Sequence, residues 1–351
     1  AAAAVLLAVA PWTALLAAAP AAAAAETLRL ATFHADLSRA GPGLLLRDIL
    51  RGEDAQVAAA RAVIVAADAD ILVLQGVDYD AEGRALGALA DALEAAGIAY
   101  PHRLALRPNT GRPTGVDIDG DGRSWRARDA QGYGLFNGQG GMAVLSRHPI
   151  GPVRDFSALL WADLPGSAAP GVVPAAALPV LRLASVAAWD VAVDLPDGRL
   201  HLLTLHATPP VFDGPEDRNG HRNADELRFW QLYLEGWAPD GPPFSAARFA
   251  LVGTLNLDPE RGEGQRDALA ALLSHPRLQD PVPRRPGGGT QTADWDDPVP
   301  GDLRVDYILP AAGLRVTGAG VLWPRDEAGD PPLSVVAAAS DHRLVWVDLA
   351  F

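Results

Sequence analysis

The sequence of 351 residues contains no cysteine and no lysine. Without cysteine, the chain can form no disulfide, no zinc-thiolate site and no cysteine nucleophile. Without lysine, it has neither a P-loop lysine nor a lysine Schiff base, and all 29 basic residues are arginine. The formal net charge of -14 disfavours unassisted binding to a nucleic-acid backbone, which usually requires a basic surface. A divalent metal ion could still bridge an acidic site to a phosphate ester.

Long apolar runs are confined to the start of the chain. Residues 1–25 are almost entirely Ala, Leu, Val and Pro, and they end in small residues before Glu26. This pattern predicts a secretory signal peptide and an exported, periplasmic or extracellular, domain over residues 26–351. A membrane anchor is the alternative, but Pro11 and Pro20 interrupt the apolar run. We expect no membrane span in the mature chain.

The remaining sequence alternates between strand and helix patterns. Hydrophobic content of 49% is ordinary for a soluble protein with a full core. A strand over 28–33, a helix over 54–69 and a strand over 70–80 indicate a layered α/β fold. Further elements are predicted as a helix over 83–96, strands over 141–150, 181–195, 199–207 and 248–258, a helix over 221–237, and strands over 302–310 and 343–349. No linker or repeat divides the chain, so we expect one domain.

The segment 107–141 has little periodicity and is predicted to be a long ordered loop. It contains the sequence DIDGDG, in which Asp117, Asp119 and Asp121 alternate before Gly122. Alternating carboxylates followed by glycine are typical of the first half of an EF-hand calcium loop. The twelfth position is Arg128 in place of glutamate, so the pattern fits either a Ca²⁺ site or a hydrogen-bonded Asp/Gly turn.

Polar residues lie at or beside several apolar strands. They are His206, Asn256, Asp306, Asp341 and His342. The adjacent Asp341 and His342 suggest an imidazole that is oriented by a carboxylate and able to accept a proton near neutral pH. Each residue alone is more often structural, but the set favours a catalytic site.

Seven motifs, in a fixed order, resemble a known superfamily. They read LATFHAD, DILVLQGVDYD, GMAVLSRHPI, LLTLHATPPVFDGPEDRNGHRNADE, LVGTLNLDP, RVDYILP and SDHRLVWVD. Together they resemble the endonuclease/exonuclease/phosphatase superfamily, in particular an exported bacterial subgroup. The resemblance implies a DNase I-like α/β fold, a four-layer α/β/β/α sandwich of two mixed sheets, and hydrolysis of a phosphate ester with Mg²⁺ or Mn²⁺.

The resemblance also implies roles for individual residues. His342, oriented by Asp341, would take a proton from the attacking water, and Asn256 would hold that water or a phosphate oxygen. His206, paired with Asp306, would hydrogen-bond the phosphoryl group. The residues expected on the substrate side are His34, Thr254 and Asn219.

Three positions depart from the family pattern. His34 stands where the family has asparagine, Gly76 where it has a metal-binding glutamate, and Thr254 where it has aspartate. These changes weaken a hard-cation site, which depends on charged oxygens. Substitute ligands could come from Asp78, on the same face as Gly76, or from Asp213 and Glu216 in the long loop.

The sequence therefore leaves three functional classes open. The first is a metal-dependent phosphodiesterase or phosphomonoesterase with impaired activity. The second is a non-catalytic member that binds a phosphorylated ligand or a protein partner. The third is a surface protein stabilised by Ca²⁺ at Asp117–Asp121. The acidic charge favours a small or lipid-borne phosphate ester over nucleic acid. Nothing in the sequence indicates an oligomeric state.

Overall fold

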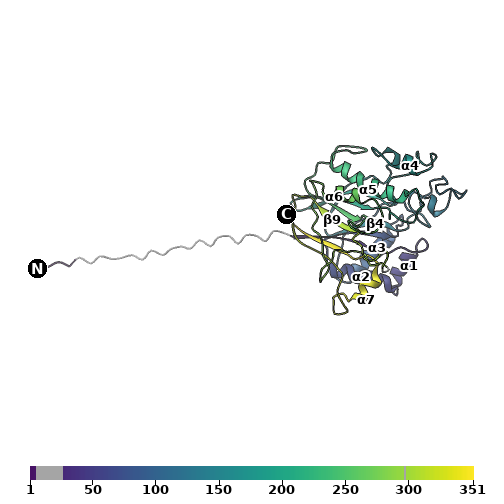
Figure 1. The fold of residues 1–351 in the computed structure, drawn as a ribbon. Coiled ribbons are helices and arrows are strands. Elements are labelled where there is room, and N and C mark those ends of the chain that lie inside the picture. Colours follow the sequence, from purple (N-terminus) through teal and green to yellow (C-terminus); the bar gives the residue numbers. More distant parts are fainter. Residues whose placement is uncertain (5–26, 296–297) are drawn as a thin grey trace.

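The computed structural model describes residues 1–4, 27–295 and 298–351 (Figure 1). Apart from its first four residues, the signal peptide predicted over 1–25 lies outside the described residues. None of the helices within the described ranges is both long and apolar enough to cross a membrane.

Strands and helices alternate along the described chain. The elements are β1 (Thr27–His34), α1 (Leu44–Arg51), α2 (Ala55–Ala67), β2 (Ile71–Val77), α3 (Arg84–Ala95), β3 (His102–Leu104), β4 (Gly141–Ser146), β5 (Ile150–Asp155), α4 (Ala169–Val172), β6 (Ala188–Leu195), β7 (Gly198–His206), α5 (Arg218–Leu234), β8 (Phe249–Thr254), α6 (Arg266–Leu273), β9 (Asp306–Pro310), β10 (Arg315–Val321), α7 (Leu333–Ala339) and β11 (Val345–Ala350). Short 3-10 turns occupy Ala127–Asp129 and Trp161–Asp163.

The strands form two mixed sheets. One sheet has the order β10-β11-β1-β2-β4-β3, in which only β1 and β2 are parallel. The other has the order β5-β6-β7-β8-β9, in which only β7 and β8 are parallel. Side chains from both sheets, such as Leu30, Val73 and Leu202, share one buried apolar cluster, so the sheets pack face to face.

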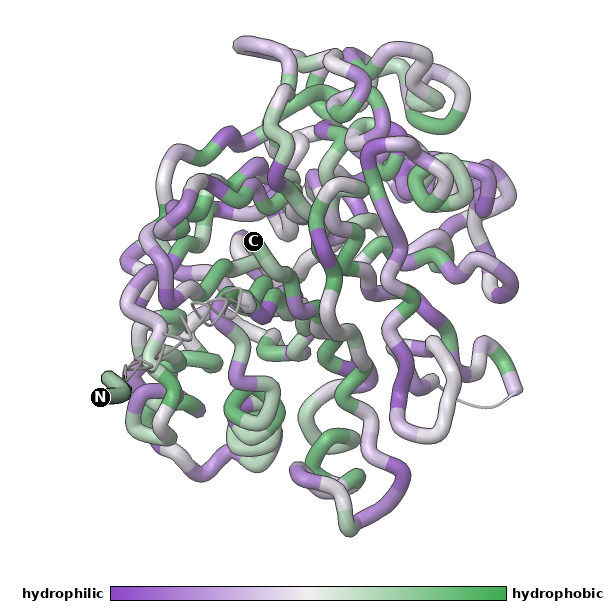
Figure 2. Tube along the Cα trace, turned by 90° about the vertical axis from the view of Figure 1, so that its left-hand side faces the viewer, coloured by the Kyte–Doolittle hydropathy of each residue, from purple (hydrophilic) through white to green (hydrophobic). Residues whose placement is uncertain are grey.

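Helices cover both outer faces, which gives four layers. The buried residues of α1, α2, α3 and α7 pack against the sheet that contains β1, and those of α5 and α6 pack against the sheet that contains β7. Figure 2 shows polar and apolar residues alternating along the chain, as expected for elements with one face toward a core. The predicted four-layer sandwich is confirmed.

Several short elements were not expected from the sequence. The strand β10 contains Gly318 and Gly320, which carry no strand signal. Its glycines are required by the neighbouring strand, because a Cβ at Gly320 would lie 2.7 Å from a ring carbon of Trp346. The helices α6 and α7 have only 8 and 7 residues, too few to show a clear helical period.

The sheet register brings polar residues together at one end of the sandwich. In the second sheet, His206 is paired with Thr254, and Thr254 is paired with Asp306, so the three lie in a row across β7, β8 and β9. In the first sheet, His34 ends β1 beside Gln75. The two sheet ends face each other, and the candidate site lies between them.

Candidate active site

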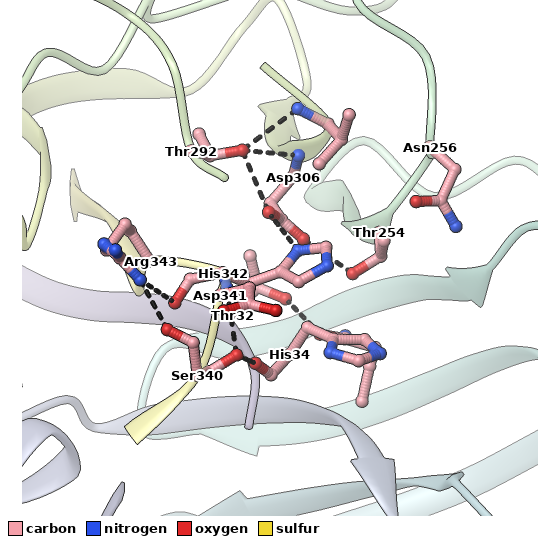
Figure 3. Close-up of polar contacts among 12 residues, drawn as sticks. Thr32, His34, Thr254, Asn256, Thr292, Asp306, Ser340, Asp341, His342 and Arg343 are labelled. Carbon is pink, nitrogen blue, oxygen red and sulfur yellow. Dashed lines mark hydrogen bonds and ion pairs between the residues drawn. The ribbon is translucent and has the colours of Figure 1, made fainter. Parts of the chain in front are cut away.

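His342 and Asp306 form the central pair of the site (Figure 3). His342 is buried in the loop before β11, and its Nδ1 lies 2.9 Å from Oδ2 of Asp306. The Asp306 carboxylate is 1% exposed. It also accepts hydrogen bonds from Thr254 Oγ1 at 2.6 Å and Thr292 Oγ1 at 2.9 Å. Three donors therefore fix this carboxylate, which in turn orients the imidazole.

The Asp306 carboxylate controls the protonation of His342. Burial lowers the pKa of His342, whereas the charge and hydrogen bond of Asp306, followed by the charges of Asp36 and Asp341, raise it. The net effect raises the pKa of His342 above its ordinary value of 6.5. With Nδ1 donating to Asp306, the neutral imidazole carries its lone pair on Nε2 and can accept a proton there.

The two predicted carboxylate-imidazole pairings are wrong. Asp306 contacts His342 and not His206, because the pairing of β8 with β9 places Asp306 opposite Thr254, toward the loop that carries His342. Asp341 is exposed, and no described hydrogen bond joins its carboxylate to His342. Its backbone N–H instead donates to Asp36 at 3.3 Å.

Three imidazoles form a histidine cluster, which consists of His34, His206 and His342. The ring centroid of His34 lies 4.3 Å from that of His342 and 4.8 Å from that of His206. Burial, followed by His34 and His342, lowers the pKa of His206 well below 6.5. His206 is therefore neutral at neutral pH and can donate one hydrogen bond to a phosphate oxygen.

Asp36 lies in the site but was not among the site residues predicted from the sequence. Its Oδ1 lies 3.1 Å from Nδ1 of His34, and its Oδ2 accepts from Ser340 Oγ at 2.7 Å. Burial raises the pKa of Asp36, but His34 and His342 outweigh burial and lower it overall. The available signal was its position two residues beyond the end of β1 in the motif LATFHAD.

Gly76 adopts a backbone conformation that few other residues tolerate. Its φ is +70°, at an irregularity between Gln75 and Val77 in the pairing of β2 with β4. A Cβ at this position would lie 2.9 Å from Cε1 of His34. The His34 ring thus fills the space that a side chain at position 76 would need.

We expect Gly76→Ala to lower the free energy of unfolding by about 1–3 kcal/mol, from the strained φ and the contact with His34. Urea unfolding followed by circular dichroism measures this. Gly87→Ala is the matched control: it lies in α3, and its nearest neighbour would be Arg103 at 3.7 Å. Because alanine favours a helix over glycine by about 1 kcal/mol, the control should be no less stable than the wild type. Equal stability of both variants would contradict the packing described.

The residues present do not fit Mg²⁺. This ion requires near-octahedral oxygen ligands and is usually held by carboxylates. The position of the expected glutamate is Gly76, its space holds the His34 ring, and both oxygens of Asp306 already accept hydrogen bonds. The remaining donors are three imidazoles and one carboxylate, Asp36, which already contacts His34 and Ser340, and magnesium does not favour imidazole nitrogens. The chemistry of the site is therefore derived from its side chains.

The structure does not bring the predicted substitute ligands to the histidine cluster. Asp78 accepts hydrogen bonds from the backbone N–H groups of Arg39 at 2.9 Å and Gly140 at 3.0 Å, and burial raises its pKa. Asp213 accepts from the backbone of Asn219, and Glu216 accepts from Gly214 at 3.4 Å. All three carboxylates therefore stabilise loops.

The predicted calcium loop is only partly assembled. Asp117 and Asp119 converge with Asp129, and ligand atoms of the three lie within 4.8 Å of one another, whereas Asp121 is not in this group. The Asp117 carboxylate accepts from the backbone of Gly120 at 2.7 Å and Gly122 at 2.8 Å. Both alternatives, the turn and the cation site, thus use the same carboxylates, and Ca²⁺ binding stays a prediction.

A cleft of about 670 Å³ opens beside the histidine cluster. His34, Asp36 and His206 are among the residues that line it. The walls combine apolar and polar side chains with arginines, including Ile118, Leu181, Val186, Val211, Thr208, Arg128 and Arg218. A phosphate ester could place its phosphoryl group at the histidines and its remaining part along these walls.

The expected substrate-side residues divide into two groups. His34 and Asn219 line the cleft, and their contact with substrate stays a prediction. Thr254 is fully buried, and its hydroxyl donates to Asp306, so it positions the carboxylate and does not face substrate.

Asn256, which was expected to hold the attacking water or a phosphate oxygen, lies on the other side of Thr254 from His342 (Figure 3), and its amide donates to Ala207 O at 2.8 Å.

A family model described as the Endonuclease/Exonuclease/phosphatase family matches residues 47–342. Comparison with curated proteins gives no match. An endonuclease/exonuclease/phosphatase from Beutenbergia cavernae DSM 12333 is similar in structure, with a TM-score of 0.56, 22% identity, and coverage of 93% of this chain and 72% of that one.

Two further solved structures have the same fold. One is an endonuclease/exonuclease/phosphatase family protein from Leptotrichia buccalis C-1013-b, with a TM-score of 0.53, 15% identity, and coverage of 92% and 100% of the two chains. The other is a family protein from Bacteroides thetaiotaomicron, with a TM-score of 0.51, 16% identity, and coverage of 94% and 99%. At these identities, the likeness concerns the fold.

Proposed function

The chain belongs to the endonuclease/exonuclease/phosphatase family, and we propose that it hydrolyses a phosphodiester or phosphomonoester at the histidine cluster. The observation that carries the proposal is the pair of His342 and Asp306, buried beside His34 and His206, two imidazoles that line an open cleft. Buried proton-transfer groups next to a cleft are typical of catalytic sites.

In this proposal, His342 is the general base. Asp306 holds Nδ1–H, so Nε2 accepts a proton from the attacking water while the water oxygen bonds to phosphorus. The P–O bond to the leaving alcohol breaks, and the alcohol oxygen takes a proton from solvent. Asp306 stabilises the imidazolium that forms, as carboxylates do in other carboxylate-imidazole pairs. Thr254 and Thr292 position the carboxylate and make no contact with substrate.

Positive charge and donors for the phosphoryl group come from residues that line the cleft. His206, neutral because of its burial, donates one hydrogen bond to a phosphoryl oxygen. Arg128 and Arg218 line the cleft and supply positive charge for an anionic substrate. Donors positioned at developing charge are the main source of rate enhancement in phosphoryl transfer.

The second candidate is a member of the family that binds a phosphorylated ligand without turnover. The position of the His34 ring, in the space of the absent glutamate side chain, favours this candidate. It uses the same cleft and the same donors, but the carboxylates expected at positions 76 and 254 are missing.

Hydrolysis of bis-p-nitrophenyl phosphate and p-nitrophenyl phosphate by the full chain separates the two candidates. The assay is run with EDTA and with Mg²⁺, Mn²⁺ or Ca²⁺. The proposal expects turnover of at least one ester, with Mg²⁺ giving little increase over EDTA. Absence of turnover under all conditions, together with saturable binding of inorganic phosphate by calorimetry, would support the binding protein instead.

A further inference from the structure

His34 and Asp36 form a second carboxylate-imidazole pair in the site, separate from the pair that holds the general base. Nδ1 of His34 is buried and lies 3.1 Å from Oδ1 of Asp36. The other carboxylate oxygen of Asp36 accepts hydrogen bonds from Ser340 Oγ at 2.7 Å and from the backbone N–H of Asp341 at 3.3 Å. Asp36 is therefore fixed in place, and its carboxylate provides the counter-charge for a protonated His34.

The edge of the His34 ring that carries Nε2 is not covered by a side chain at position 76. A Cβ at Gly76 would lie 2.9 Å from Cε1 and 3.1 Å from Nε2 of His34. Both His34 and Gly76 line the cleft. Because Nδ1 lies beside Asp36, Nε2 is the nitrogen that a substrate in the cleft can reach. The glycine that stands in place of the expected glutamate therefore leaves this nitrogen open.

The other two imidazoles of the histidine cluster are not suited to donate a proton as a cation. Burial lowers the pKa of His206 well below 6.5, so this ring is neutral at neutral pH, and a neutral imidazole is a much weaker acid than an imidazolium. Nε2 of His342 has to be unprotonated, because it accepts the proton of the attacking water. His34 is thus the imidazole of the cluster that is left to hold a proton in the cleft.

We propose that His34 is the general acid of the reaction, that its Nε2–H donates the proton to the oxygen of the leaving alcohol, and that Asp36 positions it. This inference rests on the proposed function. As the P–O bond breaks, its electron pair goes to the alcohol oxygen, which takes the proton from Nε2. His34 becomes neutral while His342 becomes protonated. Each imidazole then exchanges one proton with solvent, so the proton of the alcohol comes from solvent through His34.

One phosphoryl group can contact both the acid and the base. The ring centroids of His34 and His342 lie 4.3 Å apart, with an angle of 30° between the ring planes. The attacking and leaving oxygens lie roughly in line on either side of phosphorus, so they need two neighbouring groups. The active form carries a proton on Nε2 of His34 and none on Nε2 of His342. Acid and base are therefore separate groups, each oriented by its own carboxylate, Asp36 or Asp306.

Leaving groups that differ in their need for a proton test this role. The full chain is assayed with p-nitrophenyl and benzyl esters of the kind that it hydrolyses, phosphodiester or phosphomonoester. p-Nitrophenolate leaves readily without a proton, whereas benzyl alcohol requires one. We expect His34→Asn to lower kcat for the benzyl ester at least about 10²-fold, and kcat for the p-nitrophenyl ester less than about 10-fold. Asp36→Asn should change the ratio of the two rates in the same direction, by about 10-fold.

The matched control is His342→Ala, which removes an imidazole of the same cluster with a different role. It should lower kcat for both esters by similar factors, because the base acts on the attacking water whatever the leaving group is. Urea unfolding checks that His34→Asn is folded, and asparagine is small enough to fit the space of the ring. If that variant does not unfold cooperatively, the ratio of the two rates in Asp36→Asn decides in its place.

The outcomes separate this inference from the proposed function. Turnover of both esters by the wild type, with the larger loss for the benzyl ester in His34→Asn, supports both. Turnover of the p-nitrophenyl ester alone, or equal losses for the two esters in His34→Asn, overturns the role of His34 and leaves the proposed function standing. Absence of turnover of any ester by the wild type overturns the proposed function and the inference with it.

Discussion

Replacement of His342 by alanine should reduce kcat for bis-p-nitrophenyl phosphate by about 10²–10⁴-fold, the usual contribution of a general base. Its Nδ1 is held by Asp306, and Nε2 is the position at which a proton can be accepted. Loss of the imidazole removes that acceptor and leaves Asp306 with its two threonine donors.

The matched control for this prediction is His148→Ala. His148 is half-buried, lies in the turn between β4 and β5, and is not part of the histidine cluster. Its kcat should stay within about twofold of the wild type, as for most substitutions away from a site. If His342→Ala keeps wild-type turnover, or if His148→Ala loses as much, His342 is not the base.

The largest effect on stability is expected for Arg222→Ala. Arg222 lies in α5, is almost fully buried, and donates to the backbone carbonyls of Gln131, Arg182 and Leu183. Burial lowers the pKa of Arg222 to about 10, so the group remains charged at neutral pH. Its removal leaves three buried acceptors without their donor, which we expect to cost about 3–5 kcal/mol of the free energy of unfolding.

Urea unfolding measures this loss, with Arg218→Ala as the control on the same helix. Arg218 is partly exposed, and its hydrogen bond is a long one of 3.4 Å to Ile118 O. We expect a change below about 1 kcal/mol for the control. A similarly small change for Arg222→Ala would show that the hydrogen bonds from Arg222 to the segments around Gln131 and Arg182 do not stabilise the fold.

The fold could be predicted from the sequence because its strands are long, apolar and arranged in the family order. For example, β2 is buried throughout, and the buried face of α5 carries Leu227, Trp230 and Leu234 at the predicted spacing. The short elements could not be predicted, because glycines in β10 serve the packing of Trp346, and α6 and α7 span about two turns each.

The residues of the site could also be predicted, but their partners could not. Sequence adjacency suggested that Asp341 orients His342, whereas the sheet register places Asp306 there, 36 residues away. In the same way, Asp78 was expected on the same strand face as Gly76. Its carboxylate instead accepts hydrogen bonds from the backbone N–H groups of Arg39 and Gly140, which lie in two loops. Partners across a sheet depend on register, which short motifs do not contain.

The absence of a carboxylate at position 76 has a physical explanation that the sequence could not provide. The glutamate expected at position 76 is absent, and a Cβ there would lie 2.9 Å from Cε1 of the His34 ring. A side chain at position 76 would require this ring to move, so the two departures belong together. The combined change replaces a carboxylate with a nitrogen donor at the centre of the site.

The central claim is that His342 acts as the base and is controlled by Asp306. The dependence of kcat/KM on pH, for the wild type, Asp306→Asn and Asp341→Asn, tests it most directly. A base works only when unprotonated, so the rate should fall as the pH falls through the pKa of His342, which lies above 6.5 in the wild type.

Asp306→Asn removes the charge that raises this pKa and leaves the burial that lowers it. The acidic limb should therefore move to lower pH, with a smaller maximal rate because the imidazole is less well oriented. In Asp341→Asn, the limb should stay close to that of the wild type. A limb that moves in Asp341→Asn and stays in place in a folded Asp306→Asn would contradict the account and restore the pairing suggested by sequence adjacency.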